Sequence, residues 1–149
     1  MAACTLLWTG SLLGGIPHQS LAMYRFLLIC LGGAIGTGAR YLIAIGAPRL
    51  LGTSFPYATL TVNVVGSFLL GAIMHVGLTT NLVTPGLRLV LTTGVMGGFT
   101  TYSTFNYETM EYLREGAFWL AGLNVAFTLL LCLLAGALGL ALARWLVGS

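Results

Sequence analysis

The stretch "GGFTTYSTFN" places glycine, hydroxyl and aromatic side chains inside an otherwise apolar region of the chain. Helical spacing at about 100° per residue puts Thr101, Thr104 and Glu108 within about 60° of one another. Tyr102 and Phe105 lie side by side on an adjoining face. Hydroxyl protons and the positive edges of aromatic rings can both stabilise a small anion that has lost its water. The stretch therefore predicts a hydroxyl track that ends in a carboxylate, beside an aromatic pair.

The adjacent glycines Gly97 and Gly98 predict a break in the helix at membrane depth. Non-helical backbone is tolerated there only where it is buried in protein or lines a cavity. A break frees carbonyl oxygens, whose negative ends suit a small cation. The alternative is a helix rich in serine and threonine that simply packs against its neighbours.

Four further polar residues stand in apolar runs, namely Arg40, Asn63, Asn124 and Thr128. An intramembrane polar side chain is costly unless it faces the interior of a helix bundle or a water-filled cavity. For Asn124 we favour a hydrogen bond between helices. For Asn63 two interpretations stay open, a hydrogen bond between helices and a functional role in a cavity. The long side chain of Arg40 can also extend to the membrane surface.

The composition requires a membrane around these residues. The chain has 149 residues, of which 58% are hydrophobic and only 6% charged, whereas a soluble domain carries roughly 25% charged residues. No arginine cluster exists to follow phosphates, so we expect no nucleic-acid partner. The cysteines and histidines show no metal-ligand spacing, and Cys30 and Cys132 are interpreted as small buried hydrophobic residues.

Apolar segments long enough to cross a bilayer organise the chain. Pro48, Pro56 and Pro85 fall between them, where a missing N–H costs least. The connecting loops are short, so the function must lie within the membrane. The four predicted spans cover about residues 24–45, 57–78, 87–107 and 118–146.

The first 22 residues are weakly apolar but lack the basic start of a signal peptide. We expect residues 1–22 to be an unstructured extension arising from an upstream start, with a short interfacial segment as the alternative. Residues 23–149 then form the four-span domain.

The arginines are almost evenly divided between the two sides of such a bundle. Four spans place both termini on one side, and the asymmetry of Lys and Arg in short loops sets orientation. Near balance predicts insertion in both orientations and a dimer of opposed copies. Arg25, Arg88 and Arg144 lie on the terminal side, and Arg49 and Arg114, with Arg40 if near enough, lie on the other.

Small residues recur at the spacing that lets membrane helices approach closely. This pattern indicates packing and is nonspecific as to function. The pairs are Gly32 with Gly36, Gly33 with Thr37, Ser67 with Gly71, and Gly94 with Gly98.

Three motifs, "GGAIGTGARYLI", "YATLTVNVVGSFLLGAI" and "GVMGGFTTYSTFNYE", together resemble the Fluc (CrcB) family of fluoride channels over residues 23 to about 146. The resemblance implies an all-α integral membrane protein with four transmembrane helices, the third of them broken. It also implies an antiparallel, dual-topology homodimer in the inner (plasma) membrane, with two fluoride pores and a structural sodium ion at the dimer interface. The implied role is passive fluoride export, not enzymatic catalysis, and the implied partners are a second copy, fluoride, sodium and lipid.

The resemblance also assigns residues. Carbonyls of Gly97 and Thr100 would hold the sodium ion, and Arg40 would be a structural arginine. Two departures concern the lining of the pore: Tyr102 replaces a phenylalanine, and Asn124 stands where the family often has tyrosine. The fluoride path would include Asn63, Tyr102, Thr104, Phe105, Glu108 and Thr128, the last standing where serine is common.

Three other functions fit the sequence less well. A small dual-topology multidrug-type exporter would want an acidic residue within the membrane, but all three glutamates lie in "ETMEYLRE". An intramembrane serine protease needs a serine–histidine pair, and His75 stands alone near the end of its span. A purely structural membrane subunit would explain the packing but not the glycines followed by hydroxyls.

Overall fold

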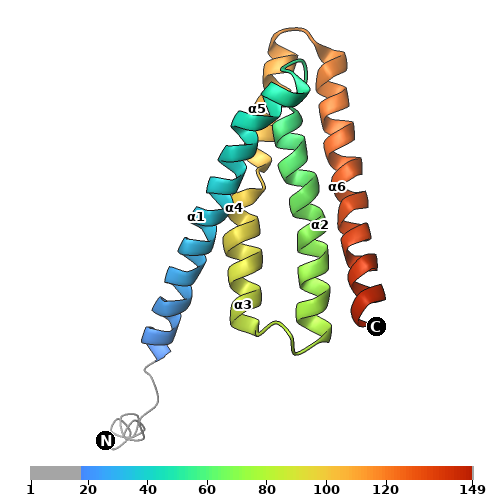
Figure 1. Cartoon of the computed structure of the whole chain (residues 1–149). Helices are drawn as coiled ribbons and strands as arrows, with labels where there is room; N and C mark the ends of the chain where they lie inside the picture. The colour runs from blue at the N-terminus through green and yellow to red at the C-terminus, as the bar shows by residue number, and fades with distance from the viewer. Residues whose placement is uncertain (1–17, 149) are drawn as a thin grey trace, which may run out of the picture.

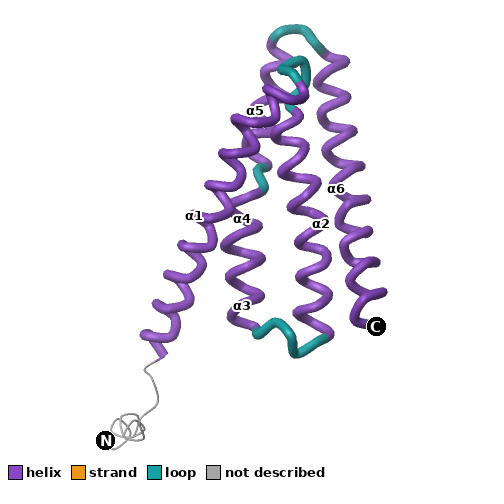
Figure 2. The backbone as a smooth tube through the Cα atoms, viewed as in Figure 1, coloured by secondary structure: helices purple, strands orange, loops and turns teal. Residues whose placement is uncertain are grey.

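The computed structural model describes residues 18–148, and this part of the chain is helical, with no strand in it. The predicted extension over residues 1–22 lies outside it except for its last five residues, which belong to the first helix. Figures 1 and 2 show long helices running side by side, joined by short loops at alternating ends. The elements are α1 (His18–Leu51), α2 (Tyr57–Thr79), α3 (Pro85–Leu89), η1 (Val90–Met96), α4 (Gly97–Phe99), α5 (Tyr102–Arg114) and α6 (Phe118–Val147).

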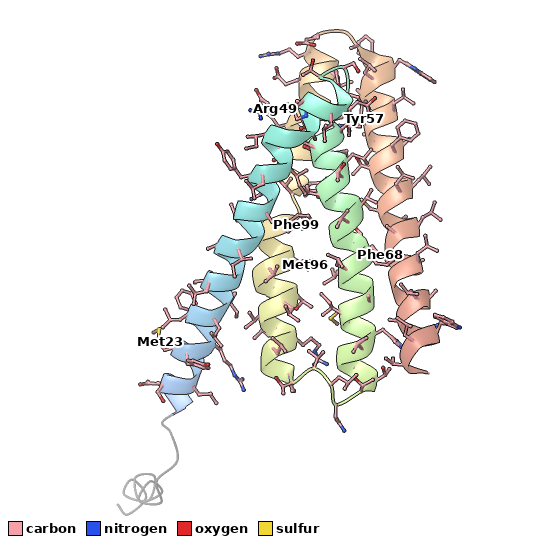
Figure 3. The ribbon with its side chains drawn as sticks, in the orientation of Figure 1. Met23, Arg49, Tyr57, Phe68, Met96 and Phe99 are labelled. Carbon is pink, nitrogen blue, oxygen red and sulfur yellow. The ribbon has the colours of Figure 1, made fainter. Side chains whose placement is uncertain are left out.

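Three helices in the described part are long and apolar enough to cross a membrane, over residues Gln19–Leu51, Tyr57–Thr79 and Phe118–Val147. Most of their large apolar side chains face outward, as a lipid environment requires. Near Met23, α1 diverges from the other helices, and Arg49 lies toward its opposite end (Figure 3). Both ends of the described chain lie at the same end of the bundle (Figure 1), as the predicted even number of crossings requires.

The third predicted span is broken, but the predicted position of the break is wrong. Gly97 and Gly98 are helical, and the non-helical residues are Thr100 (φ −79°, ψ 160°) and Thr101 (φ −151°, ψ 108°). The preceding segment η1 is a π-helix, a widened form that is often found at functional sites. The segment is therefore α3, η1 and α4 in series, an extended pair, and then α5.

Gly98 is explained by packing against α1. A Cβ on Gly98 would overlap the carbonyl oxygen of Gly33, and one on Gly36 would overlap that of Val95. A Cβ on Gly94 would lie 2.8 Å from the carbonyl oxygen of Ile29. The close approach predicted from small-residue spacing is thus confirmed between α1 and the η1–α4 segment.

A second close contact joins α2 and α6, which run side by side in Figure 1. A Cβ on Gly71 would overlap the carbonyl oxygen of Gly136, and a Cβ on Gly139 would overlap that of Phe68. The sequence pattern identified Gly71 but not its partners on α6. These contacts hold α6 against the polar face of α2.

The prolines are placed as predicted in two of three cases. Pro85 occupies the first turn of α3, after Thr84 caps that helix, and Pro56 immediately precedes α2. Pro48, however, lies inside α1 and not between spans. It falls in the last turn, where the helix ends soon afterwards at Gly52 with a positive φ, so its missing N–H interrupts little of the helix.

Candidate functional site

The break in the third segment is held by one side chain from α2. The Thr101 amide donates to Asn63 Oδ1 at 2.8 Å, and Asn63 Nδ2 donates to the Thr101 carbonyl at 3.1 Å. Asn63 and Thr101 are both buried. In a continuous helix the Thr101 amide would donate to the Gly97 carbonyl. Asn63 therefore replaces the helical bonding of Thr101, which explains why the break falls here.

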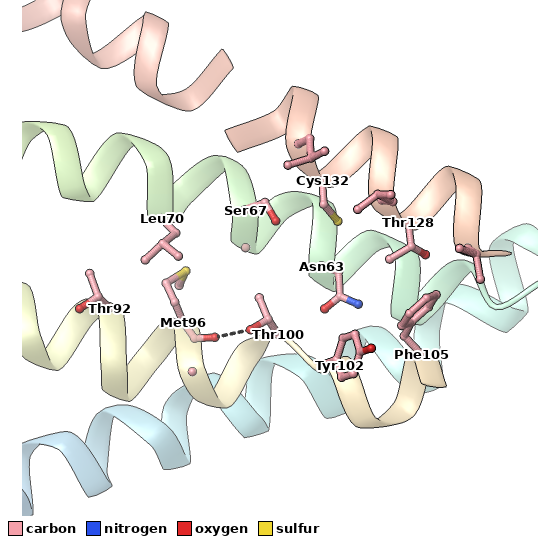
Figure 4. A pocket seen from close by; sticks show the side chains of 15 residues that line it. Asn63, Ser67, Leu70, Thr92, Met96, Thr100, Tyr102, Phe105, Thr128 and Cys132 are labelled. Atoms are coloured by element: carbon pink, nitrogen blue, oxygen red, sulfur yellow. Dashed lines mark hydrogen bonds between the residues drawn. The ribbon is translucent and has the colours of Figure 1, made fainter. Parts of the chain in front are cut away.

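Glycine on α2 makes room for the extended pair. A Cβ on Gly66 would overlap the side-chain methyl of Thr100. Thr100 turns its hydroxyl back toward the preceding helix, donating to the Met96 carbonyl at 3.0 Å (Figure 4). Asn63 and Gly66 thus act together. Asn63 satisfies the polar backbone of Thr101, and Gly66 lets Thr100 come close to α2.

Thr101 also starts the next helix. Its Oγ1 accepts from the Thr104 amide at 3.2 Å, an N-cap of α5, and its hydroxyl donates to Thr104 Oγ1 at 2.8 Å. Capping of this kind satisfies a free N–H of the first turn. The two hydroxyls predicted as neighbours along a track are therefore bonded to each other.

Glu108, the predicted end of this track, bonds to a side chain of α2. Its Oε1 accepts from the Thr59 hydroxyl at 2.6 Å, while its Oε2 is buried and has no partner in the described part of the chain. Thr59 was not identified from the sequence. It precedes Asn63 by one turn of α2, so helical spacing from Asn63 offered a signal that could have found it.

A cavity of about 610 Å³ opens between α2, the broken segment and α6 (Figure 4). Thr128 faces this cavity, and its Oγ1 is buried without a hydrogen-bond partner among the described residues. Cys132, one turn further along α6, also lines the cavity and is only partly buried. Cys30 on α1 is exposed, so the prediction that both cysteines are buried is wrong. The polar and aromatic lining is Asn63, Ser67, Thr92, Gly97, Thr100, Tyr102, Phe105, Thr128 and Cys132.

The predicted aromatic pair is present at one end of this cavity. The ring centroids of Tyr102 and Phe105 are 5.6 Å apart with the planes inclined by 54°. Tyr102 is 78% exposed, whereas Phe105 is partly buried. Both rings can therefore present edges toward a guest in the cavity.

Arg40 and Thr104 line a different cavity, of about 390 Å³, on the α1 side of the break. Thr59 and Thr101 line it as well. The prediction of one continuous track beside the aromatic pair is therefore too simple. Thr104 faces away from the cavity that Phe105 and Thr128 share, and the bonded pair of Asn63 and Thr101 lies between the two spaces.

Glu108 lines a third cavity, of about 260 Å³, near the end of α5. Glu111 and Glu115 face the same space, and Arg114 forms an ion pair with Glu111. Burial raises the pKa of Tyr112 above its ordinary value, and the nearby carboxylates of Glu108 and Glu115 raise it further. The phenol therefore stays neutral at this acidic end.

Asn124 bonds between helices, as favoured from the sequence. It is only 1% exposed, and its Nδ2 donates to Thr109 Oγ1 at 2.9 Å. Thr109 was missed by sequence reasoning, and its hydroxyl in turn donates to the Phe105 carbonyl at 2.8 Å. Asn124 consequently does not line the large cavity, unlike its neighbour Thr128.

The long apolar helices define a multi-pass membrane protein, with a partly polar cavity beside the break in its third segment. The model of the family described as "CrcB-like protein, Camphor Resistance (CrcB)" matches residues 27–140. The chain belongs to this family.

Curated relatives agree over their full lengths. One from Sorangium cellulosum is 56% identical over 128 residues, covering 85% of this chain and all of the relative. Another from Anaeromyxobacter dehalogenans is 52% identical over 126 residues, with 85% of this chain and all of the relative covered. A third from Geobacter sulfurreducens is 49% identical over 124 residues, covering 83% of this chain and all of the relative. Each is named "Fluoride-specific ion channel FluC".

Proposed function

We propose that this protein is a fluoride-selective channel that lets fluoride leave the cell passively across the inner membrane and so lowers its toxicity. The observation that carries the proposal is the cavity beside the helix break, lined by two aromatic rings and by Thr128, whose hydroxyl has no hydrogen-bond partner within residues 18–148. The names of the full-length relatives support the choice of fluoride.

Fluoride is small and strongly hydrated, so a selective path must replace its water with donors at close range. The Asn63 amide has two N–H groups and uses one on the Thr101 carbonyl. The Thr128 hydroxyl has no partner among the described residues, and the Tyr102 and Phe105 rings add positive edges. Larger halides would fit this lining poorly.

Beyond the break, the proposed path crosses to the separate cavity that Thr104 lines and then reaches Glu108, which lines a third cavity. Arg40 shares a cavity with Thr104, where its guanidinium contributes positive charge in addition to a structural role. Thr59 holds the Glu108 carboxylate, which keeps it beside the hydroxyls.

The working unit in this proposal is an antiparallel homodimer with a structural sodium ion at its interface. The near balance of arginines supports opposed insertion. Gly97 and Thr100 would supply carbonyls to the sodium ion. The redirected Thr101 amide favours this role, because it leaves the Gly97 carbonyl without the donor that a continuous helix provides. Oxygen ligands of this kind suit a hard cation.

Conduction requires no catalytic step, so the proposal excludes enzymatic activity. A multidrug-type exporter is not favoured, because its proton exchange would need an acidic side chain deep in the bundle. Glu108, Glu111 and Glu115 instead gather around the cavity at the end of α5.

The test uses the purified full chain in liposomes loaded with potassium fluoride or potassium chloride. Valinomycin carries the potassium, so that anion flow is not limited by charge. Fluoride, measured with an ion-selective electrode, should leave rapidly, and chloride should stay. Equal efflux of the two anions, or none of fluoride, would refute the proposal.

A further inference from the structure

A chain of buried hydrogen bonds connects α6 to the backbone of Phe105. Asn124 Nδ2 donates to Thr109 Oγ1 at 2.9 Å, and the Thr109 hydroxyl donates to the Phe105 carbonyl at 2.8 Å. Thr109 and Asn124 are both buried, with Asn124 almost completely so. The bond between Asn124 and Thr109 is the one that joins two helices, and breaking it would leave the buried Asn124 Nδ2 without this partner in a low-dielectric interior.

The geometry places this chain directly behind the large cavity. Phe105 lies one turn before Thr109 on α5, and Thr128 lies one turn after Asn124 on α6. Phe105 and Thr128 both line the cavity, whereas Thr109 and Asn124 are not among its lining residues. The bond between Asn124 and Thr109 thus joins α5, which carries Phe105, to α6, which carries Thr128.

The short helix α5 depends on such a connection. It follows the extended pair Thr100 and Thr101, so the hydrogen bonding of α4 does not continue into it. Its packing is mainly against α6. The bond from Asn124 to Thr109 therefore fixes where α5, and the Phe105 ring on it, lies relative to α6.

We propose that Asn124 and Thr109 are positioning residues that set the distance between Phe105 and Thr128, and through it the preference for fluoride over larger anions. This inference rests on the proposed function. A site for a small dehydrated ion fails when its supporting residues leave it about 1 Å too loose. Widening the cavity should admit chloride before it stops fluoride.

The experiment compares three variants in liposomes, Asn124→Leu, Thr109→Val and the double variant, measuring the fluoride-to-chloride flux ratio and the thermal unfolding of each purified protein. Thr109→Val leaves the buried Asn124 Nδ2 without its acceptor, and Asn124→Leu removes the donor to Thr109 Oγ1, so each single change should lower stability. The double variant replaces both partners with apolar groups and should regain stability. Its flux ratio should stay reduced by about five-fold or more, the factor that one lost hydrogen bond represents.

Two controls separate positioning from folding. Thr109→Ser keeps a hydroxyl that can accept from Asn124 and donate to Phe105, so it should retain the native flux ratio. Thr79→Val removes a similar bond, from the Thr79 hydroxyl to the His75 carbonyl at 2.8 Å, far from the cavity, and should leave the ratio unchanged. If the double variant fails to fold, the flux ratios of Thr109→Val and Thr109→Ser are compared instead. A reduced ratio in Thr109→Val alone would support the inference.

A native flux ratio in the double variant, or in Thr109→Val, would overturn the inference while leaving the proposed function standing. A ratio that simply followed thermal stability across all variants would also overturn it, since packing alone would then explain the effect. A wild-type protein that passed no fluoride would overturn the proposed function, and this inference with it.

Discussion

At the scale of single residues, Asn63 stabilises the break in the third segment and also contributes to the cavity beside it. Its amide satisfies both backbone groups of Thr101, and the same side chain lines the large cavity. The sequence identified Asn63 as a polar residue in an apolar run but left its role open. The role of Asn63 depends on Thr101, its partner 38 residues away. Helical spacing within one segment cannot identify a partner on another helix.

Replacing Asn63 should therefore disturb both stability and conduction. In Asn63→Leu, the amide and carbonyl of Thr101 lose their partners, at a cost of about 1–3 kcal/mol for each buried group. We expect earlier thermal unfolding in detergent and strongly reduced fluoride flux. Asn63→Asp keeps an acceptor for the Thr101 amide but loses the donor, so it should be intermediate. An unchanged unfolding temperature in Asn63→Leu would show that water satisfies the Thr101 amide and carbonyl as well as Asn63 does.

Phe105 tests whether the aromatic edge matters. Phe105→Ala should cut fluoride flux, because alanine offers neither a positive edge nor bulk, and it should leave the proposed dimer assembled. A fully buried phenylalanine costs roughly 3–5 kcal/mol on truncation, and the partial exposure of Phe105 should reduce that loss. Flux in liposomes and dimer stability in detergent are measured on the same protein.

The matched control is Phe105→Leu, which restores much of the bulk without the ring. We expect it to assemble normally and to remain defective in flux. Wild-type flux in both variants would mean that Phe105 does not contact the ion.

At the scale of elements, hydropathy predicted where the helices lie, and close contacts explain where they meet. The apolar runs fixed α2 and α6 nearly to the residue, because length and composition decide a membrane helix. The sequence predicts the break three residues too early, at Gly97, because adjacent glycines favour a break, whereas the non-helical residues are Thr100 and Thr101. The packing of Gly98 against Gly33 gives that glycine a different role.

The contact between α2 and α6 gives a prediction with an internal control. Gly139→Ala should destabilise the protein, because the added methyl would overlap the Phe68 carbonyl oxygen. Gly122→Ala adds the same methyl to the same helix with nothing within 4 Å. It should be neutral or stabilising, since alanine favours a helix by up to about 1 kcal/mol over glycine. Equal unfolding temperatures for the two variants would contradict the close packing.

The predicted site residues do not all border one cavity. Tyr102, Phe105, Asn63 and Thr128 do share a cavity, but Thr104 faces another. Thr104 lies on the same helix α5 as Tyr102 and Phe105, and helical spacing already puts it on a different face from the aromatic pair. Spacing within one segment cannot show that these two faces border two separate cavities, because residues of other helices complete each cavity.

At the scale of the whole molecule, the arginines at the two ends of the bundle give a prediction about orientation. A reporter at the C-terminus, such as a cysteine for membrane-impermeant labelling, should be found on both sides of the membrane in one cell population. The reason is the near balance of arginines, which gives insertion no strong preference. Labelling from one side alone would contradict dual topology. Adding two arginines beside Arg144 serves as a control, because it should bias the population toward one orientation.

The break also constrains how the protein is made. A segment whose backbone hydrogen bonds stop at Thr100 and Thr101 would expose polar groups to hydrocarbon if it entered the membrane alone. The groups that satisfy Thr101 belong to Asn63 of α2, which leaves the ribosome earlier. We therefore expect the third segment to wait at the translocon until α2 is in place. The order of the chain makes such a delay possible, because α2, which carries Asn63, is synthesised before Thr100 and Thr101.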